Sequence, residues 1–118
     1  MPLIIIKSNA SDISSEIKSC IFEETGNSLS RILQKSKDFV MTLLELEQEM
    51  CFAGNADDIC AYVEIKNVGT ITPDVSKELS GEITAILCKY LDVCKERVYL
   101  EFQQSDRHLW GWNGKTFS

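Results

Sequence analysis

Four stretches of the chain have the apolar pattern of β-strands, in which apolar residues are either continuous or alternate with polar ones. The first, Leu3–Lys7, is almost wholly aliphatic, which is typical of a strand covered on both faces. The others are Phe39–Leu44, Ile59–Val68 and Arg97–Phe102. We therefore expect a sheet of four long strands.

Two segments between these strands repeat apolar residues at the spacing of an amphipathic helix. The first covers about residues 12 to 34, after a polar stretch that supplies N-cap candidates, and Gly26 is expected to weaken or bend it. The second begins after Thr72, a suitable N-cap, with Pro73 in the first helical position and Asp74 at the positive end of the helix dipole. Each helix has one apolar face, so both should cover the same side of the sheet.

The order strand, helix, strand occurs twice, and "IIIKSN" and "VEIKNV" occupy matching places in the two halves. This pattern predicts an α+β fold of two right-handed βαβ units that form one four-stranded sheet in a single domain, residues 1–118. Short extra strands are expected at "EMCFAGN", where Gly54-Asn55 makes a turn into the third strand. Asn113-Gly114 predicts a tight turn in the aromatic tail.

The second face of this sheet has nothing in the chain left to cover it. It should carry Ile4 and Ile6 or their neighbours, together with Tyr62, Glu64 and alternate residues of the last strand. A half-apolar face without a cover usually contacts a partner. Homo-oligomerisation is the simplest source of one.

Composition excludes several classes of function. The net charge of −6 over 118 residues leaves no overall basic footprint for nucleic acid or an anionic membrane, and no stretch approaches the length of a membrane span. The run Leu3–Ile6 is too short for a secretory signal, so we expect a cytosolic protein that would need export without a signal peptide for any extracellular role. His108 is the only histidine, which argues against a His-based triad or a multi-histidine metal site. We therefore expect no metal site. The five cysteines should be reduced, mostly buried thiols, because none of their spacings is CxxC: Cys20, Cys51, Cys60, Cys88 and Cys94.

Pro2 stands directly behind the initiator methionine and opens the first strand. A small second residue favours removal of Met1, which would leave the proline amine as the N-terminus. An α-amino group titrates near pH 8, and apolar surroundings or nearby lysines lower that pKa toward neutrality. The neutral amine would then carry a lone pair suited to a general base.

Several segments, in this order, resemble the macrophage migration inhibitory factor family of the tautomerase superfamily. They are "MPLIII" at the start, "FAGN" before "CAYVEIKNVG", "ERVYLEF", and the closing "WGWNGKTFS". The resemblance covers essentially the whole chain. It implies a homotrimer with active sites between subunits, in which the N-terminal proline moves a proton during keto–enol tautomerisation of phenylpyruvate- or dopachrome-type substrates.

The resemblance also assigns roles to individual residues. Pro2 matches the base, and Lys35 matches a lysine that meets the substrate carboxylate, with Lys37 as a rival because the chain reads Gln-Lys-Ser-Lys there. Val68 falls where the family offers a backbone amide to the substrate. Tyr99 matches a pocket tyrosine lent by the neighbouring subunit, where it would donate a hydrogen bond or pack.

Other positions complete or depart from the family pattern. Trp112 and Phe117 are the expected aromatic walls of the pocket, chosen over Phe39 and Trp110. Glu101 stands where relatives often have Asn, and its charge would repel an anionic substrate. Two functions follow: an isomerase, acting as a cofactor-free tautomerase, or alternatively a cytokine-like protein that binds a cell-surface receptor and keeps a vestigial pocket.

Overall fold

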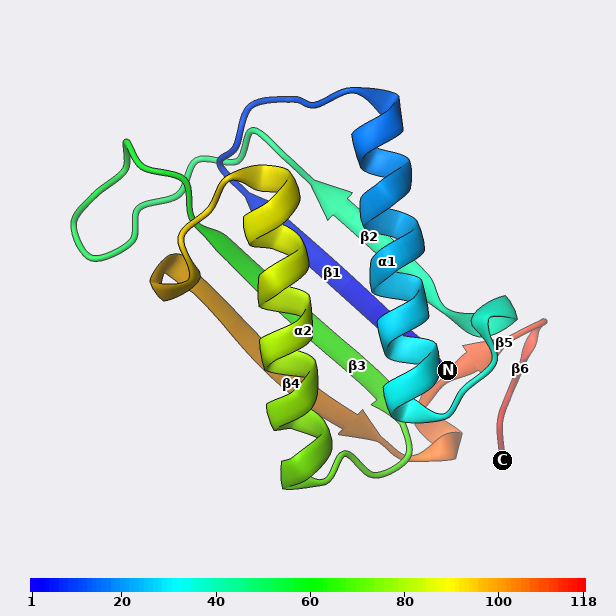
Figure 1. Cartoon of the computed structure of the whole chain (residues 1–118). Coiled ribbons are helices and arrows are strands. Elements are labelled where there is room, and N and C mark those ends of the chain that lie inside the picture. Colours follow the sequence, from blue (N-terminus) through cyan, green and yellow to red (C-terminus); the bar gives the residue numbers. More distant parts are fainter.

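The computed structural model describes all of residues 1–118 as two helices packed on one face of a four-stranded sheet (Figure 1). The strands lie in the order β2-β1-β3-β4. The main elements are β1 (Pro2–Ser8), α1 (Ser15–Leu33), β2 (Met41–Glu45), β3 (Ala61–Val68), α2 (Pro73–Leu91) and β4 (Val98–Ser105).

The sheet pairing confirms the two βαβ units. β1 pairs with β2 in parallel and β3 pairs with β4 in parallel, while β1 and β3 are antiparallel at the centre. In the central pair Pro2 lies opposite Asn67 and Ser8 lies opposite Ala61. The start of the chain therefore lies beside the ends of β3 and β4.

Strand alternation produces the core. The side chains of Ile4, Ile6, Val63 and Ile65 are fully buried because they point from the two central strands toward the helices. Burying an aliphatic side chain of this size stabilises the fold by about 1.5–3 kcal/mol. The helix residues that meet them are also fully buried: Ile21, Leu29, Leu79, Ile83 and Leu87.

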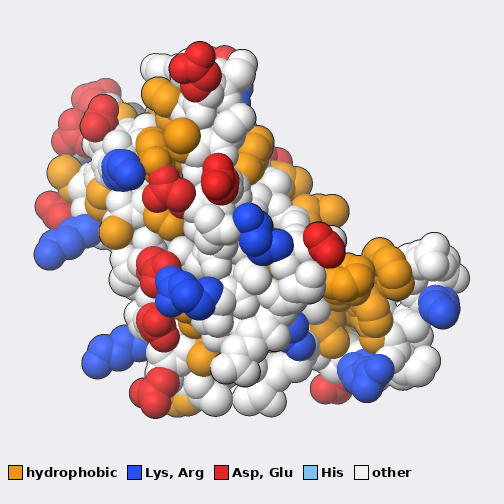
Figure 2. Space-filling model, turned by 45° about the vertical axis from the view of Figure 1, so that its right-hand side comes forward, with side chains coloured by type: hydrophobic (Ala, Val, Ile, Leu, Met, Phe, Trp, Pro, Cys, Tyr) orange, Lys and Arg blue, Asp and Glu red, His pale blue; other side chains and the backbone are white.

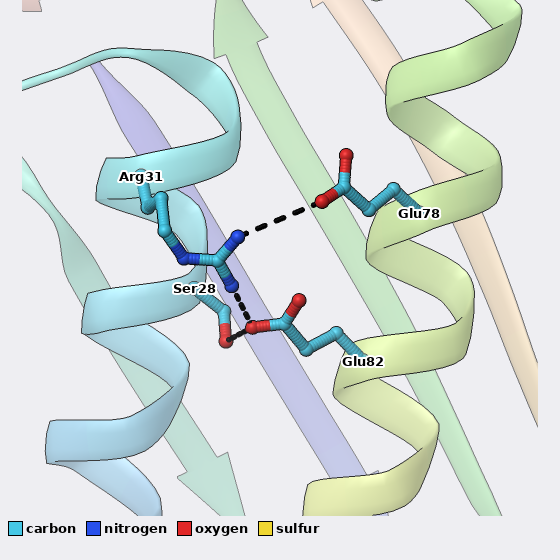
Figure 3. Close-up of polar contacts among 4 residues, drawn as sticks. All are labelled: Ser28, Arg31, Glu78 and Glu82. Carbon is cyan, nitrogen blue, oxygen red and sulfur yellow. Dashed lines mark hydrogen bonds and ion pairs between the residues drawn. The ribbon is translucent and has the colours of Figure 1, made fainter.

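A polar cluster joins the two helices on the side away from the sheet (Figure 3). Arg31 of α1 forms ion pairs with Glu82 of α2 and, at 3.5 Å, with Glu78. The Ser28 hydroxyl donates to Glu82 over 2.8 Å. These bonds hold the pKa of Glu82 below its ordinary value, first through Arg31 and then through Ser28.

The first helix begins later than predicted, at Ser15 rather than near residue 12. The Ser14 side chain caps it by accepting a hydrogen bond from the amide of Ile17 over 3.2 Å. Asp12 instead forms an ion pair with Lys18 at 2.8 Å. The helix continues through Gly26, which is buried inside it.

The segment "EMCFAGN" differs from the expected short strand. Only one isolated bridge forms, between Phe52 and Asn55, and β3 begins at Ala61 rather than Ile59. The segment projects from the fold as a loop, and Arg97 fixes its base through hydrogen bonds to four backbone carbonyls. Those bonds take the place of strand pairing for this loop.

The uncovered face of the sheet has an apolar half and a polar half. On the apolar half Leu3 and Ile5, the neighbours of the buried isoleucines, lie beside Met41 and Leu43. Met41 is 62 % exposed and Leu43 is 38 % exposed. The polar half consists of Tyr62, Glu64, Lys66, Tyr99, Glu101 and Gln103.

The tail folds back as a small arm beside the N-terminus (Figure 1). Its two short strands, β5 (Gly111–Trp112) and β6 (Lys115–Thr116), are joined at Asn113-Gly114, as the sequence predicted. Both turn residues have positive φ, 55° and 79°, as a hairpin turn of this kind requires. Figure 2 shows hydrophobic side chains gathered where this arm leaves the body of the molecule.

Candidate functional site

One end of the sheet brings together four separate parts of the chain. A cavity of about 470 Å3 lies at this end. It is surrounded by the start of β1, the turn after α1, the end of β3, and the end of β4 with the segment that follows it. It is lined by Met1, Lys35, Val68, Gly69, Ser105, Asp106, Arg107 and Phe117.

The capping of α1 places Lys35 at this cavity. Gln34 ends the helix in the left-handed conformation with φ 55°. The Lys35 amide then donates to the Ser30 carbonyl over 3.0 Å, and the Ser30 hydroxyl donates to the Lys35 carbonyl over 2.6 Å. Lys37, the rival cation, lines a different hollow beside Phe22.

The backbone conformation at Gly69 requires glycine. Its φ of +117° disfavours any residue with a Cβ. A Cβ there would lie 3.9 Å from the Lys35 ammonium nitrogen and 3.8 Å from the Asn67 side-chain nitrogen, both ordinary contacts. These distances place the Lys35 ammonium group beside the end of β3.

The terminal amine titrates in an unusual environment. In the chain that still carries Met1, burial lowers the pKa of its α-amino group, and the charge of Lys35 lowers that pKa further. Both causes disfavour the protonated amine. Pro2 itself is buried directly behind Met1, at less than 2 % exposure.

Asn67 adds a buried polar group next to Pro2. It is 2 % exposed, and its side-chain oxygen has no hydrogen-bond partner. Leaving a buried acceptor unpaired costs about 1–3 kcal/mol. Sequence reasoning did not single out Asn67, because nothing in the letters shows that its amide points into the protein.

The expected aromatic residues lie on two sides of the N-terminus. Phe117 lines the cavity with Lys35, whereas Trp112 lines a neighbouring hollow with Pro2. The Trp112 and Phe117 rings stack with centroids 6.2 Å apart, and the Phe39 ring meets Trp112 edge-on at 5.4 Å.

Tyr99 lies at the other end of the sheet in the same chain. Its ring is 64 % exposed and packs edge-on against Phe52 at 4.9 Å. Along β4 it is six positions before Ser105, which lines the cavity, so the two are about 20 Å apart at the rise of an extended strand. A chain by itself cannot bring its own Tyr99 to this cavity.

Glu101 is engaged on the uncovered face rather than in the cavity. The Tyr62 hydroxyl donates to Glu101 and, over 3.2 Å, to Glu64. The hydrogen bond to Glu101, followed by burial, raises the pKa of Tyr62 well above its ordinary value. The phenol therefore stays protonated and shares its proton with both carboxylates.

Arg107 and Asp106 line the cavity, and sequence reasoning missed both. The signal available was the charged pair in "SDRHLW", just before the aromatic tail. Only the fold shows that this segment turns back toward the N-terminus.

Neither helix has the length and apolar character needed to cross a membrane. No three His, Cys, Asp or Glu side chains come close enough together to hold a metal ion.

The doubled βαβ architecture, with Pro2 as the first residue of a central strand, places the chain among the small α+β proteins of the tautomerase superfamily. The whole chain, residues 1–118, matches the family described as "Macrophage migration inhibitory factor (MIF)". The chain belongs to this family.

Individual relatives agree along their full length. A macrophage migration inhibitory factor homologue of Brugia malayi is 28 % identical over 117 residues, covering 99 % of both chains. The crystal structure of a homologue from Prochlorococcus marinus superposes with a TM-score of 0.90 at 30 % identity, over 98 % of this chain and 99 % of that one. Leishmania major MIF2 superposes with a TM-score of 0.90 at 26 % identity, over 99 % and 97 %.

Proposed function

We propose that this protein is a cofactor-free keto–enol tautomerase of the phenylpyruvate or dopachrome type, with Pro2 as its general base. The family supports tautomerase or cytokine-like function in general. The observation that carries the specific proposal is the environment of the terminal amine, whose pKa is lowered by burial and by Lys35. Removal of Met1 would leave the amine of Pro2 at this end of β1.

The proposed reaction moves one proton between carbon and oxygen. The neutral Pro2 nitrogen takes a proton from the carbon next to the substrate carbonyl, and the C–H electron pair becomes the C=C bond of the enol. The protonated Pro2 nitrogen then gives this proton to the carbonyl oxygen, directly or through a water molecule, so the amine is neutral again and atoms and charge balance. Lys35 binds the substrate carboxylate, and the backbone amide of Val68 donates a hydrogen bond to it.

Phe117 and Trp112 form the apolar walls of the proposed site. Their stacked rings lie beside the N-terminal strand and offer an aromatic surface for the substrate ring. Apolar walls also exclude water, which keeps the amine unprotonated.

We propose that the protein assembles as a homotrimer, in which each site borrows Tyr99 from the neighbouring subunit. Two facts support this: Tyr99 is too far from its own cavity, and Leu3, Ile5, Met41 and Leu43 form an apolar surface that no part of the chain covers. In this arrangement Tyr99 would donate a hydrogen bond to the substrate carbonyl.

The test compares the tautomerisation of phenylpyruvate by wild type, Pro2→Ala and Pro73→Ala, with intact mass to verify removal of Met1. Pro73 is the only other proline, begins α2 and does not line the cavity, so it is the matched control. Pro2→Ala replaces the rigid ring amine with the flexible primary amine of alanine, and this weakened base should lower kcat/KM by up to the roughly 10²–10⁴-fold that loss of a general base costs. Equal rates in the two variants would remove Pro2 as the base.

Subunit mixing tests the shared site. Pro2→Ala and Tyr99→Ala chains, each nearly inactive alone, are unfolded together and refolded. Random assembly of a cyclic trimer would place an intact Pro2 beside an intact Tyr99 in about a quarter of the sites, so activity should reappear. If the refolded mixture is no more active than the two variants are alone, the result argues against a site built from two subunits.

The alternative remains a cytokine-like protein that binds a receptor and keeps a vestigial pocket. We propose synthesis in the cytosol, with export independent of a signal peptide for that role. Pro2→Gly separates the two functions, because receptor binding that persists after tautomerisation is lost would make the pocket dispensable for signalling.

A further inference from the structure

Arg107 differs from the other two arginines of the chain in what its guanidinium contacts. Arg31 binds two carboxylates, and Arg97 donates from all three of its nitrogens to backbone carbonyls. Arg107 donates only from Nε, to the Phe117 carbonyl over 2.9 Å. Its two terminal nitrogens have no partner in the protein, and it forms no ion pair with the adjacent Asp106.

The backbone holds Arg107 in place at the rim of the cavity. The Phe117 amide donates to the Arg107 carbonyl over 3.2 Å, so the two residues are joined by hydrogen bonds in both directions. The guanidinium is therefore oriented before any ligand arrives. A planar fork held in this way suits the two oxygens of a carboxylate.

The cavity has cations at two separate places. Lys35 follows α1, and its ammonium nitrogen lies beside Gly69 at the end of β3, next to Asn67, the residue opposite Pro2. Arg107 follows β4 and is hydrogen-bonded to the tail at Phe117. Lys35 therefore lies nearer to the reacting end of the cavity and Arg107 lies farther from it. These two cations outnumber Asp106, the one carboxylate that lines the cavity, so in a chain of net charge −6 the cavity is locally attractive to anions.

We propose that the cavity prefers a 2-oxo acid with a second carboxylate, the first acid group binding Lys35 and the second binding the free fork of Arg107. The inference rests on the proposed tautomerase function and specifies its substrate class. A substrate such as phenylpyruvate, with one acid group, leaves Arg107 unused. The volume of about 470 Å3 has room for an aromatic diacid of this kind.

The test uses 4-carboxyphenylpyruvate and phenylpyruvate, which differ by one carboxylate on the ring. The measured quantity is kcat/KM for 4-carboxyphenylpyruvate divided by kcat/KM for phenylpyruvate. We expect Arg107→Gln to lower this ratio about tenfold, which is the size of one partly exposed charge-assisted contact. Lys115→Gln, an exposed lysine of the same tail that does not line the cavity, is the matched control and should leave the ratio unchanged. Arg107→Lys keeps the charge without the fork and should give an intermediate ratio.

A binding measurement separates this inference from the proposed activity. Calorimetry compares 4-carboxyphenylacetate with phenylacetate, neither of which has the ketone needed for turnover. Suppose that no 2-oxo acid is turned over, but that 4-carboxyphenylacetate binds wild type about tenfold tighter than phenylacetate does and binds Arg107→Gln no tighter. The tautomerase proposal then fails and the diacid site stands. If wild type binds both acids equally, or if Arg107→Gln behaves as Lys115→Gln does, the diacid site is refuted.

Discussion

Replacing Arg97 with methionine tests how the projecting loop between β2 and β3 is held. The loop lacks strand pairing apart from the single bridge of Phe52 with Asn55. Arg97 instead binds it from the short 3-10 turn Lys95–Arg97, before β4. Methionine keeps much of the length of the arginine stem and removes the guanidinium.

The loss in the free energy of unfolding follows from the contacts that the Arg97 guanidinium makes. Nε donates to the Ile59 carbonyl over 3.0 Å and Nη1 donates to the Phe52 carbonyl over 3.2 Å. Nη2 donates to the carbonyls of Asn55 and Asp58, each over 3.0 Å. Three of the four bonds are partly buried, and each contributes about 0.5–1.5 kcal/mol net. The guanidinium also lies 5.3 Å from the Phe52 ring centroid, which adds about 0.5–1 kcal/mol.

The three partly buried bonds and the cation–π contact together predict that Arg97→Met lowers the free energy of unfolding by about 2–5.5 kcal/mol, measured by urea denaturation. In hydrogen-exchange measurements, Arg97→Met should speed the exchange of the amides of residues 48–59 relative to wild type, and should speed that of the β3 amides less. Lys95→Met is the control, because Lys95 is exposed on the same turn and makes no ion pair. A loss below about 1 kcal/mol, or one equal to that of Lys95→Met, would refute the account of the loop.

The loop also supports the residue proposed for the neighbouring site. Phe52 packs against Tyr99 on one side and against Arg97 on the other. Release of the loop therefore removes the packing that orients Tyr99.

Two further predictions concern the core and the helix pair. Leu87→Ala should cost about 2–5 kcal/mol in the free energy of unfolding, because Leu87 is fully buried against the sheet, whereas Lys77→Ala on an exposed part of α2 should cost less than about 0.5 kcal/mol. Glu82→Gln should make the free energy of unfolding depend less on pH at the acid end. The pKa of Glu82 is lower in the folded protein than in the unfolded chain, so its ionised carboxylate stabilises the fold fully above the unfolded pKa of about 4.3. This stabilisation is lost as pH falls through the lower folded pKa. Urea titrations from pH 7 down to pH 3 would measure this, and parallel curves for wild type and the variant would contradict it.

Strand and helix positions could be predicted from the sequence because burial alternates cleanly. β1 alternates between buried and half-buried residues from Pro2 to Ser8, and each helix has one buried stripe. Element boundaries depended on hydrogen bonds that several nearby residues could have made. Ser14 rather than Asp12 caps α1, and Arg97 rather than a strand partner fixes the loop.

The candidate site was predictable only in part, for a similar reason. Lys35, Val68 and Phe117 follow recognisable segments of the family, and all three line one cavity. Arg107 and Asn67 were not predictable, because their significance depends on their contacts: Arg107 lines the cavity with two unpaired terminal nitrogens, and Asn67 buries an unpaired amide oxygen. A residue's letter gives its chemistry, but only the fold gives the direction of its side chain.

The position of the N-terminus at the centre of the sheet connects the fold to the proposed chemistry. Because β1 is an inner strand, its residues from Leu3 onward are paired with β2 on one side and β3 on the other, and Pro2 is aligned with Asn67 of β3. A terminal amine on an edge strand would fray and stay hydrated, which would keep its pKa ordinary. Here the same pairing places the chain start where partial burial and the charge of Lys35 lower the pKa of the Met1 amine. The Pro2 amine of the proposed mechanism would lie one residue farther along this strand once Met1 is removed, so the register that the core requires also sets the surroundings of the proposed base.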